Sequence, residues 1–80
     1  MATSPLEKDD IFQLSPNPTN DIVYIKTIIQ DYKVRILNAN GQFLLETTAK
    51  EIDLSTYPKG IYFINIEFDG KRFVKQVLRN

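Results

Sequence analysis

The feature that most constrains the fold is the stretch 60–68, Gly-Ile-Tyr-Phe-Ile-Asn-Ile-Glu-Phe. It is rich in β-branched and aromatic residues, which are favoured in strands. Because successive side chains of a strand point to opposite faces, Tyr62, Ile64 and Ile66 are predicted to form one row in the core, which Phe68 continues. The opposite row is also largely apolar. A strand that is apolar on both faces is expected at the centre of a sheet.

The turn before this strand supports the same interpretation. Pro58 fixes its own φ, and Gly60 can adopt a positive φ because it has no Cβ atom. Tyr62 follows the turn glycine by two residues. That position is typical of the tyrosine corner of immunoglobulin-like sandwiches, where the ring fills the core edge and the hydroxyl binds backbone across the turn. We expect a structural role for Tyr62, and contact with a ligand is the alternative.

Short apolar or alternating segments separated by turn signals occupy most of the chain. The other predicted strands are 11–14, 21–28, 32–37, 42–47, 52–54 and 72–78. Asn40-Gly41 and Asp69-Gly70 are typical of hairpin turns, and the proline-rich segment 15–21 is predicted to be a stiff corner between the two sheets. The pattern predicts an all-β, immunoglobulin-like or fibronectin-like antiparallel β-sandwich of about seven short strands.

Length and composition restrict the function. Eighty residues allow one domain; we interpret residues 1–10 as a flexible linker or terminal tail and residues 11–80 as the sandwich. Ten basic and ten acidic residues balance, which argues against a partner that is nucleic acid or an anionic membrane.

The chain lacks cysteine and histidine, and so it lacks thiolate chemistry and the commonest general base and metal ligand. No apolar run approaches the roughly 18 residues of a membrane span. We therefore expect no transmembrane segment, no catalytic site, no metal and no cofactor.

The last predicted strand is basic. Lys71, Arg72, Lys75 and Arg79 lie in or beside it, and no acidic residue follows Asp69. Lysine and arginine can protect an edge strand from pairing with another chain. Alternatively, they can form a basic strip that a receptor recognises. The residues alone favour protection of the edge.

Four segments, in this order, resemble the C-terminal sorting domain of the type IX secretion system of Bacteroidetes-type bacteria. They are the Pro16-Asn17-Pro18 motif within 14–21, the hairpin 34–42 with its turn glycine, the pair of segments 52–55 and 60–63, and the terminal segment 75–79. The sequence departs from the family pattern at Leu14-Ser15, where an aromatic residue is usual, and at its last residue, Asn80.

The resemblance implies a sandwich that ends a larger exported protein. Such a domain directs a cargo, N-terminal to it in the parent chain, from the periplasm across the outer membrane. The implied partners are outer-membrane components of the secretion system and a sortase-like cysteine protease that removes the domain. The cargo would then be secreted or attached to the cell surface. A weak dimer through an edge strand is a further expectation.

The resemblance also assigns roles to residues. The recognised sorting signal would be formed by Lys75, Gln76, Val77, Leu78 and Arg79. Structural roles would fall to Pro16, Asn17, Pro18, Gly41, Asp53, Leu54, Gly60 and Tyr62. We hypothesise that residues 75–80 are recognised by strand addition or charge contact.

The alternative function is an accessory carbohydrate-binding or adhesive sandwich module of a secreted enzyme. It would need an aromatic platform, and the candidates are Tyr24, Tyr32, Phe43 and Tyr57. Two or three exposed aromatic side chains on one sheet face would favour this alternative, whereas a polar face with an open basic edge would favour sorting.

Overall fold

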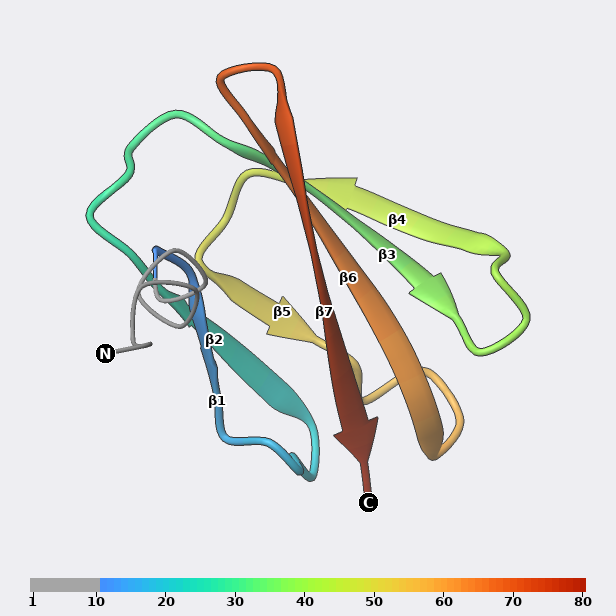
Figure 1. Ribbon diagram of the computed structural model, residues 1–80. Coiled ribbons are helices and arrows are strands. Elements are labelled where there is room, and N and C mark those ends of the chain that lie inside the picture. Colours follow the sequence, from blue (N-terminus) through green and yellow to red (C-terminus); the bar gives the residue numbers. More distant parts are fainter. Residues whose placement is uncertain (1–10) are drawn as a thin grey trace, which may run out of the picture.

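The computed structural model describes residues 11–80, which form two antiparallel sheets packed face to face (Figure 1). Within these residues the strands are β1 (Gln13–Ser15), β2 (Ile22–Lys26), β3 (Lys33–Asn38), β4 (Phe43–Thr47), β5 (Glu51–Asp53), β6 (Gly60–Phe68) and β7 (Lys71–Arg79). The predicted all-β sandwich of seven short strands is confirmed. The predicted linker 1–10 lies outside the described residues.

The two sheets differ in size. The smaller has the strand order β1-β2-β5, and the larger has the order β4-β3-β6-β7. β6 therefore lies between β3 and β7, as its two apolar faces predicted. Over 11–80 the structure contains no helix that is long and apolar enough to cross a membrane.

The core is made of the inward rows of both sheets. Tyr62, Ile64 and Ile66 of β6 are buried, as predicted, and so are Val34 and Ile36 of β3. The facing rows come from the smaller sheet. Their buried members are Val23 and Ile25 of β2, Ile52 of β5 and Leu54 just after it. The alternation of apolar residues thus places both sheets correctly around one core.

One end of the core is filled by aromatic rings. Phe12 is only 1% exposed. Its ring centroid lies 5.7 Å from that of Tyr32, 6.2 Å from that of Phe68 and 5.2 Å from that of Phe73. Edge-on and tilted ring pairs at such separations are favourable beyond the area they bury. Phe12 thereby links the segment before β1 to the end of β6 and the start of β7.

The turn before β6 has the predicted tyrosine corner. The Tyr62 hydroxyl donates a hydrogen bond to the backbone carbonyl of Pro58, and Gly60 has a φ of 144°. At the β3–β4 hairpin Gly41 has a φ of 84°. Both glycines lie in the region that residues with a side chain rarely adopt, which explains why glycine stands at each turn.

Two details differ from the sequence prediction. β1 spans Gln13–Ser15 rather than 11–14. The segment 15–21 does not carry the chain to the other sheet, because β1 and β2 pair in the same sheet. It does reach across the sandwich to contact β7, as described next.

Candidate recognition strand

β7 is an edge strand of the larger sheet, where it is hydrogen-bonded to β6. The register pairs Gly60 with Arg79 and Phe68 with Lys71. Directly opposed residues of antiparallel strands share a face. The residues of β7 opposite the buried Tyr62, Ile64 and Ile66 must therefore face the core: Val77, Lys75 and Phe73. Arg79, two residues beyond Val77, faces the same side. Val77 is completely buried.

This register divides the predicted signal residues. Lys75, Val77 and Arg79 point into the sandwich, and Gln76 and Leu78 point outward. Leu78 lies opposite Ile61 of β6, and its side chain is 40% exposed. A partner that meets the folded domain can therefore reach the side chains of Gln76 and Leu78 from the outer face.

The outer edge of β7 is covered near its C-terminal end by Asn17. The Asn17 side-chain nitrogen donates to the Gln76 carbonyl at 2.9 Å, and its side-chain oxygen accepts from the Leu78 backbone N–H at 3.1 Å. The amide group of one side chain thus supplies the donor and acceptor that the backbone of a neighbouring strand would supply.

Thr19 continues the same contact with its backbone. Its N–H donates to the Leu78 carbonyl at 2.9 Å, and its carbonyl accepts from the Asn80 N–H at 2.8 Å. Thr19 is only 2% exposed, and its hydroxyl donates to the Ile22 carbonyl at 2.7 Å. In Figure 1 this loop between β1 and β2 lies beside the end of β7. We call residues 17–19 the edge clip.

The edge clip bears on one prediction. Strand addition along residues 75–80 would have to displace the clip, because from the Gln76 carbonyl onward the outward backbone groups already bind it. The sequence signal for the clip was an asparagine between two prolines. That motif predicted a corner but not its contact with a strand 59 residues away.

The predicted structural residues lie mostly near this strand. Pro16 and Pro18 flank the clip residue Asn17, Gly60 is paired with Arg79, and Tyr62 is paired with Val77. Leu54 is buried, and its N–H donates to the Asp21 carbonyl at 2.8 Å, at the end of the same loop. Gly41 is the exception, because it lies in the β3–β4 hairpin on the other side of the larger sheet.

Asp53 is linked to the signal segment by charge. Hydrogen bonds from the Ser55 hydroxyl and N–H hold the pKa of the Asp53 carboxyl below its usual value, and the positive charge of Arg79 acts in the same direction. The Arg79 Nε atom is buried without a hydrogen-bond partner among residues 11–80. The Arg79 side chain is thus half-buried and not fully exposed.

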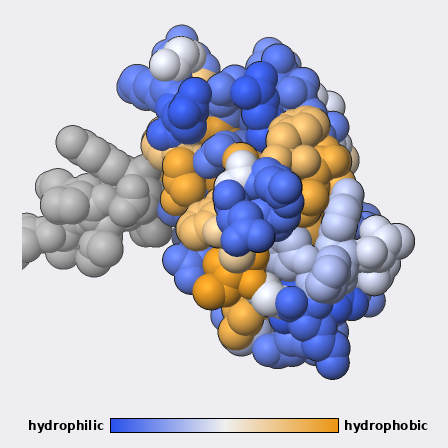
Figure 2. Space-filling model, turned by 90° about the vertical axis from the view of Figure 1, so that its right-hand side faces the viewer, coloured by the Kyte–Doolittle hydropathy of each residue, from blue (hydrophilic) through white to orange (hydrophobic). Residues whose placement is uncertain are grey.

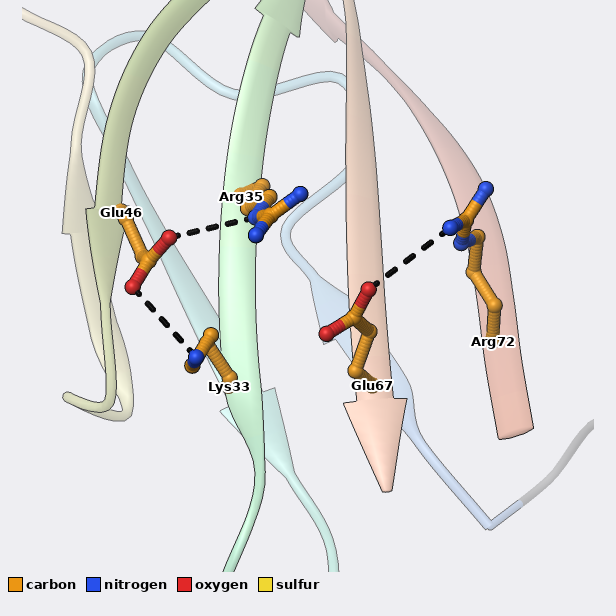
Figure 3. A network of polar contacts seen from close by, with 5 residues as sticks. All are labelled: Lys33, Arg35, Glu46, Glu67 and Arg72. Carbon is orange, nitrogen blue, oxygen red and sulfur yellow. Dashed lines mark hydrogen bonds and ion pairs between the residues drawn. The ribbon is translucent and has the colours of Figure 1, made fainter. Parts of the chain in front are cut away.

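The outer face of the larger sheet has a charged end. Glu46 accepts from Arg35 at 3.1 Å and pairs with Lys33 at 3.7 Å, and Glu67 pairs with Arg72 at 3.7 Å (Figure 3). These pairs lie across β4-β3 and β6-β7. All are substantially exposed, so each contributes little to stability.

The other end of that face is apolar. Leu37 lies opposite both Phe43 and Phe63, and Ile61 lies opposite Leu78. Phe43 is 58% exposed. On the side of the molecule drawn in Figure 2, hydrophobic surface occurs in areas bordered by hydrophilic surface. The outer face is therefore neither all polar nor a line of exposed aromatic rings.

The candidate sugar platform does not form. Tyr32 is buried in the core, Tyr24 is on the outer side of β2, and Phe43 is on the larger sheet. Tyr57 is half-buried in the turn before β6, with its ring 6.3 Å from that of Tyr62. Over residues 11–80, no group of three or more acidic side chains could hold a metal ion.

One known family matches the region that contains these motifs. A sequence model of the family described as secretion system C-terminal sorting domain matches residues 13–80. The matched region begins at the first residue of β1 and includes the edge clip and all of β7. No curated protein matches the chain at a significant level.

Proposed function

This chain belongs to the type IX secretion system C-terminal sorting domain family, and we propose that the secretion machinery recognises it through residues 75–79 of β7. Members of this family are sorting signals and not enzymes, and they direct secretion across the outer membrane to the cell surface or the medium. The observation that carries the proposal is the family match over 13–80, which includes the whole of this strand.

The mechanism is recognition rather than chemistry. β6 on one side and the edge clip on the other hold β7 in one register. The outward side chains of Gln76 and Leu78 are thereby presented at fixed positions, with Ile61 beside Leu78. An apolar side chain that is partly exposed beside another can anchor a partner when the contact excludes water. The same shape can then be recognised whatever cargo it is joined to.

The remaining parts of the proposal rest on the family resemblance. A cargo precedes the domain in the parent chain, and outer-membrane components of the secretion system bind the domain. A sortase-like cysteine protease then removes the domain, and the cargo is attached to the surface or released.

A fusion experiment tests the sorting role. Residues 11–80 are joined to a fluorescent protein that carries a signal peptide, in a bacterium that has this secretion system. We expect fluorescence at the surface or in the medium, and retention in the periplasm when the secretion channel is deleted. A folded, intact fusion that stays in the periplasm of the wild-type strain would contradict the role.

A further inference from the structure

Within residues 11–80, no strand pairs with the part of the β7 edge that precedes the edge clip. The Leu78 N–H and carbonyl bind the clip, so they point away from β6. In an antiparallel pair this direction alternates along the strand, and the backbone groups of Arg72 and Val74 must also point outward. Among residues 11–80, no hydrogen bond joins these groups to another segment.

The surroundings of this open edge can accommodate another chain. The Val74 side chain is 57% exposed. An open groove of about 400 Å³ lies between β7 and β1, lined in part by Lys75 and Gln76 and by Leu14 and Ser15. β1 is hydrogen-bonded to β2 and β7 to β6. The two strands that border the groove are thus the edges of different sheets.

The charge of this half of β7 is one-sided. Lys71 and Arg72 are its exposed cations, Lys75 faces the sandwich, and no acidic residue follows Asp69. Arg72 is paired with Glu67 across the outer face at 3.7 Å, but both side chains are exposed. Exposed pairs are weak and exchange readily with other carboxylates. An acidic segment therefore fits this edge better than a basic one.

We propose that an extended acidic segment of the secretion machinery adds as a strand to Arg72, Val74 and Gln76 of β7. The inference rests on the proposed function, because it names how the machinery engages the same strand. Pairing through backbone groups does not depend on the partner's side chains, and carboxylates beside Lys71 and Arg72 would select an acidic partner. The added strand must end at the Gln76 N–H, since the Gln76 carbonyl already accepts from Asn17.

The first test is a titration of the 80-residue chain with a synthetic seven-residue peptide of alternating threonine and glutamate, followed by amide NMR. We expect shifts at the amides of Arg72, Val74 and Gln76, and weaker binding at high salt. A peptide of alternating threonine and lysine is the charge control and should not bind. Binding of both peptides alike, or shifts elsewhere only, would overturn the proposal.

Two variants of Val74 separate backbone pairing from side-chain contact. Val74→Pro removes the outward N–H, and proline is tolerated at such a position of an edge strand. We expect Val74→Pro to bind the acidic peptide about fivefold more weakly or worse, because a lost backbone hydrogen bond costs about 1 kcal/mol. Val74→Ala keeps the N–H and should bind like the natural chain. If Val74→Pro does not fold, Arg72→Pro tests the same edge.

The same variants are then measured in the export fusion. We expect Val74→Pro to lose export while its unfolding midpoint stays near that of Val74→Ala. Normal export of folded Val74→Pro would overturn strand addition, and the sorting role would still stand if deletion of the channel abolished export. Self-association of the chain through these amides, without peptide binding, would overturn the proposal in favour of a second copy as the occupant.

Discussion

A single side chain, that of Asn17, covers part of the β7 edge. Asn17→Ala removes its bonds to the Gln76 carbonyl and the Leu78 N–H. Because both bonds are exposed, we expect a loss of about 1–2 kcal/mol in the free energy of unfolding. Urea denaturation measures this loss. Hydrogen exchange at the Leu78 amide should become faster, because that N–H loses its acceptor.

The matched control for Asn17 is Asn20, which is exposed in the same loop. Asn20→Ala should change stability much less. Asn17→Asp should be intermediate, because it keeps an acceptor for Leu78 but loses the donor to Gln76. Equal stability of the two alanine variants would show that the side-chain bonds of Asn17 contribute nothing to holding the edge.

The buried Tyr32 hydroxyl makes stability depend on pH in alkali. It has no hydrogen-bond partner among residues 11–80, and burial raises its pKa above the ordinary value. Below about pH 10, the ordinary tyrosine pKa, the hydroxyl is protonated in both states and has no effect. Above it the unfolded chain releases the proton first, so the free energy of unfolding falls as pH rises toward the folded pKa.

Tyr32→Phe removes this effect. Urea denaturation of both chains from pH 8 to 11 should show a smaller alkaline loss of stability in the variant. At pH 8 the variant should be as stable as the natural chain or more stable, because an unpaired buried hydroxyl is removed while the ring contact with Phe12 can remain. If the free energy of unfolding fell equally steeply above about pH 10 in both chains, Tyr32 would titrate alike in the folded and unfolded states.

Among single residues, those whose partners lie nearby in the sequence were the most predictable. The Tyr62 corner was predicted because Pro58, Gly60 and Tyr62 lie within five residues of one another, and the hydroxyl of Tyr62 reaches the backbone of the adjoining turn. The contact of Asn17 with β7 could not be predicted, because its partner is 59 residues away and the two meet only when the sheets pack.

At the scale of strands, regular alternation predicted the facing of β3 and β6, and irregular sequence did not predict that of β4. Leu44 and Leu45 are both half-buried. The register of β3 with β4 shifts between Ile36 and Leu37. An extra residue at such a bulge breaks the two-residue period. The three adjacent apolar residues Phe43, Leu44 and Leu45 gave no indication of where that break occurs.

β7 shows that edge protection and recognition can share one strand. The edge clip covers the end that contains Leu78. The half that precedes the clip contains Lys71, Arg72 and Lys75, and such charges discourage pairing with other chains of ordinary composition. The same charges favour an acidic partner. The two readings of the basic strand, protection and recognition, are therefore compatible.

For the whole molecule, the prediction that residues 75–79 form a sorting signal remains a proposal, whereas the fold and family are confirmed. Alternation and turn residues were sufficient for the sandwich because they act at short range. Which surface a partner touches depends on the register of β7 and on the clip. The family resemblance therefore assigns five residues to the signal. Only the register of β7 shows that two of them, Gln76 and Leu78, have outward side chains.

The most direct measurement of the central claim is the exported fraction of the fluorescent fusion with Leu78→Ser, compared with Tyr24→Ser. The two side chains are similarly exposed, 40% and 46%, but Tyr24 lies on the smaller sheet, away from β7. With both variants folded, we predict that Leu78→Ser lowers export about tenfold, the effect of losing about 1.4 kcal/mol at an interface anchor, and that Tyr24→Ser leaves export unchanged. Equal export of the two variants would contradict recognition through this strand.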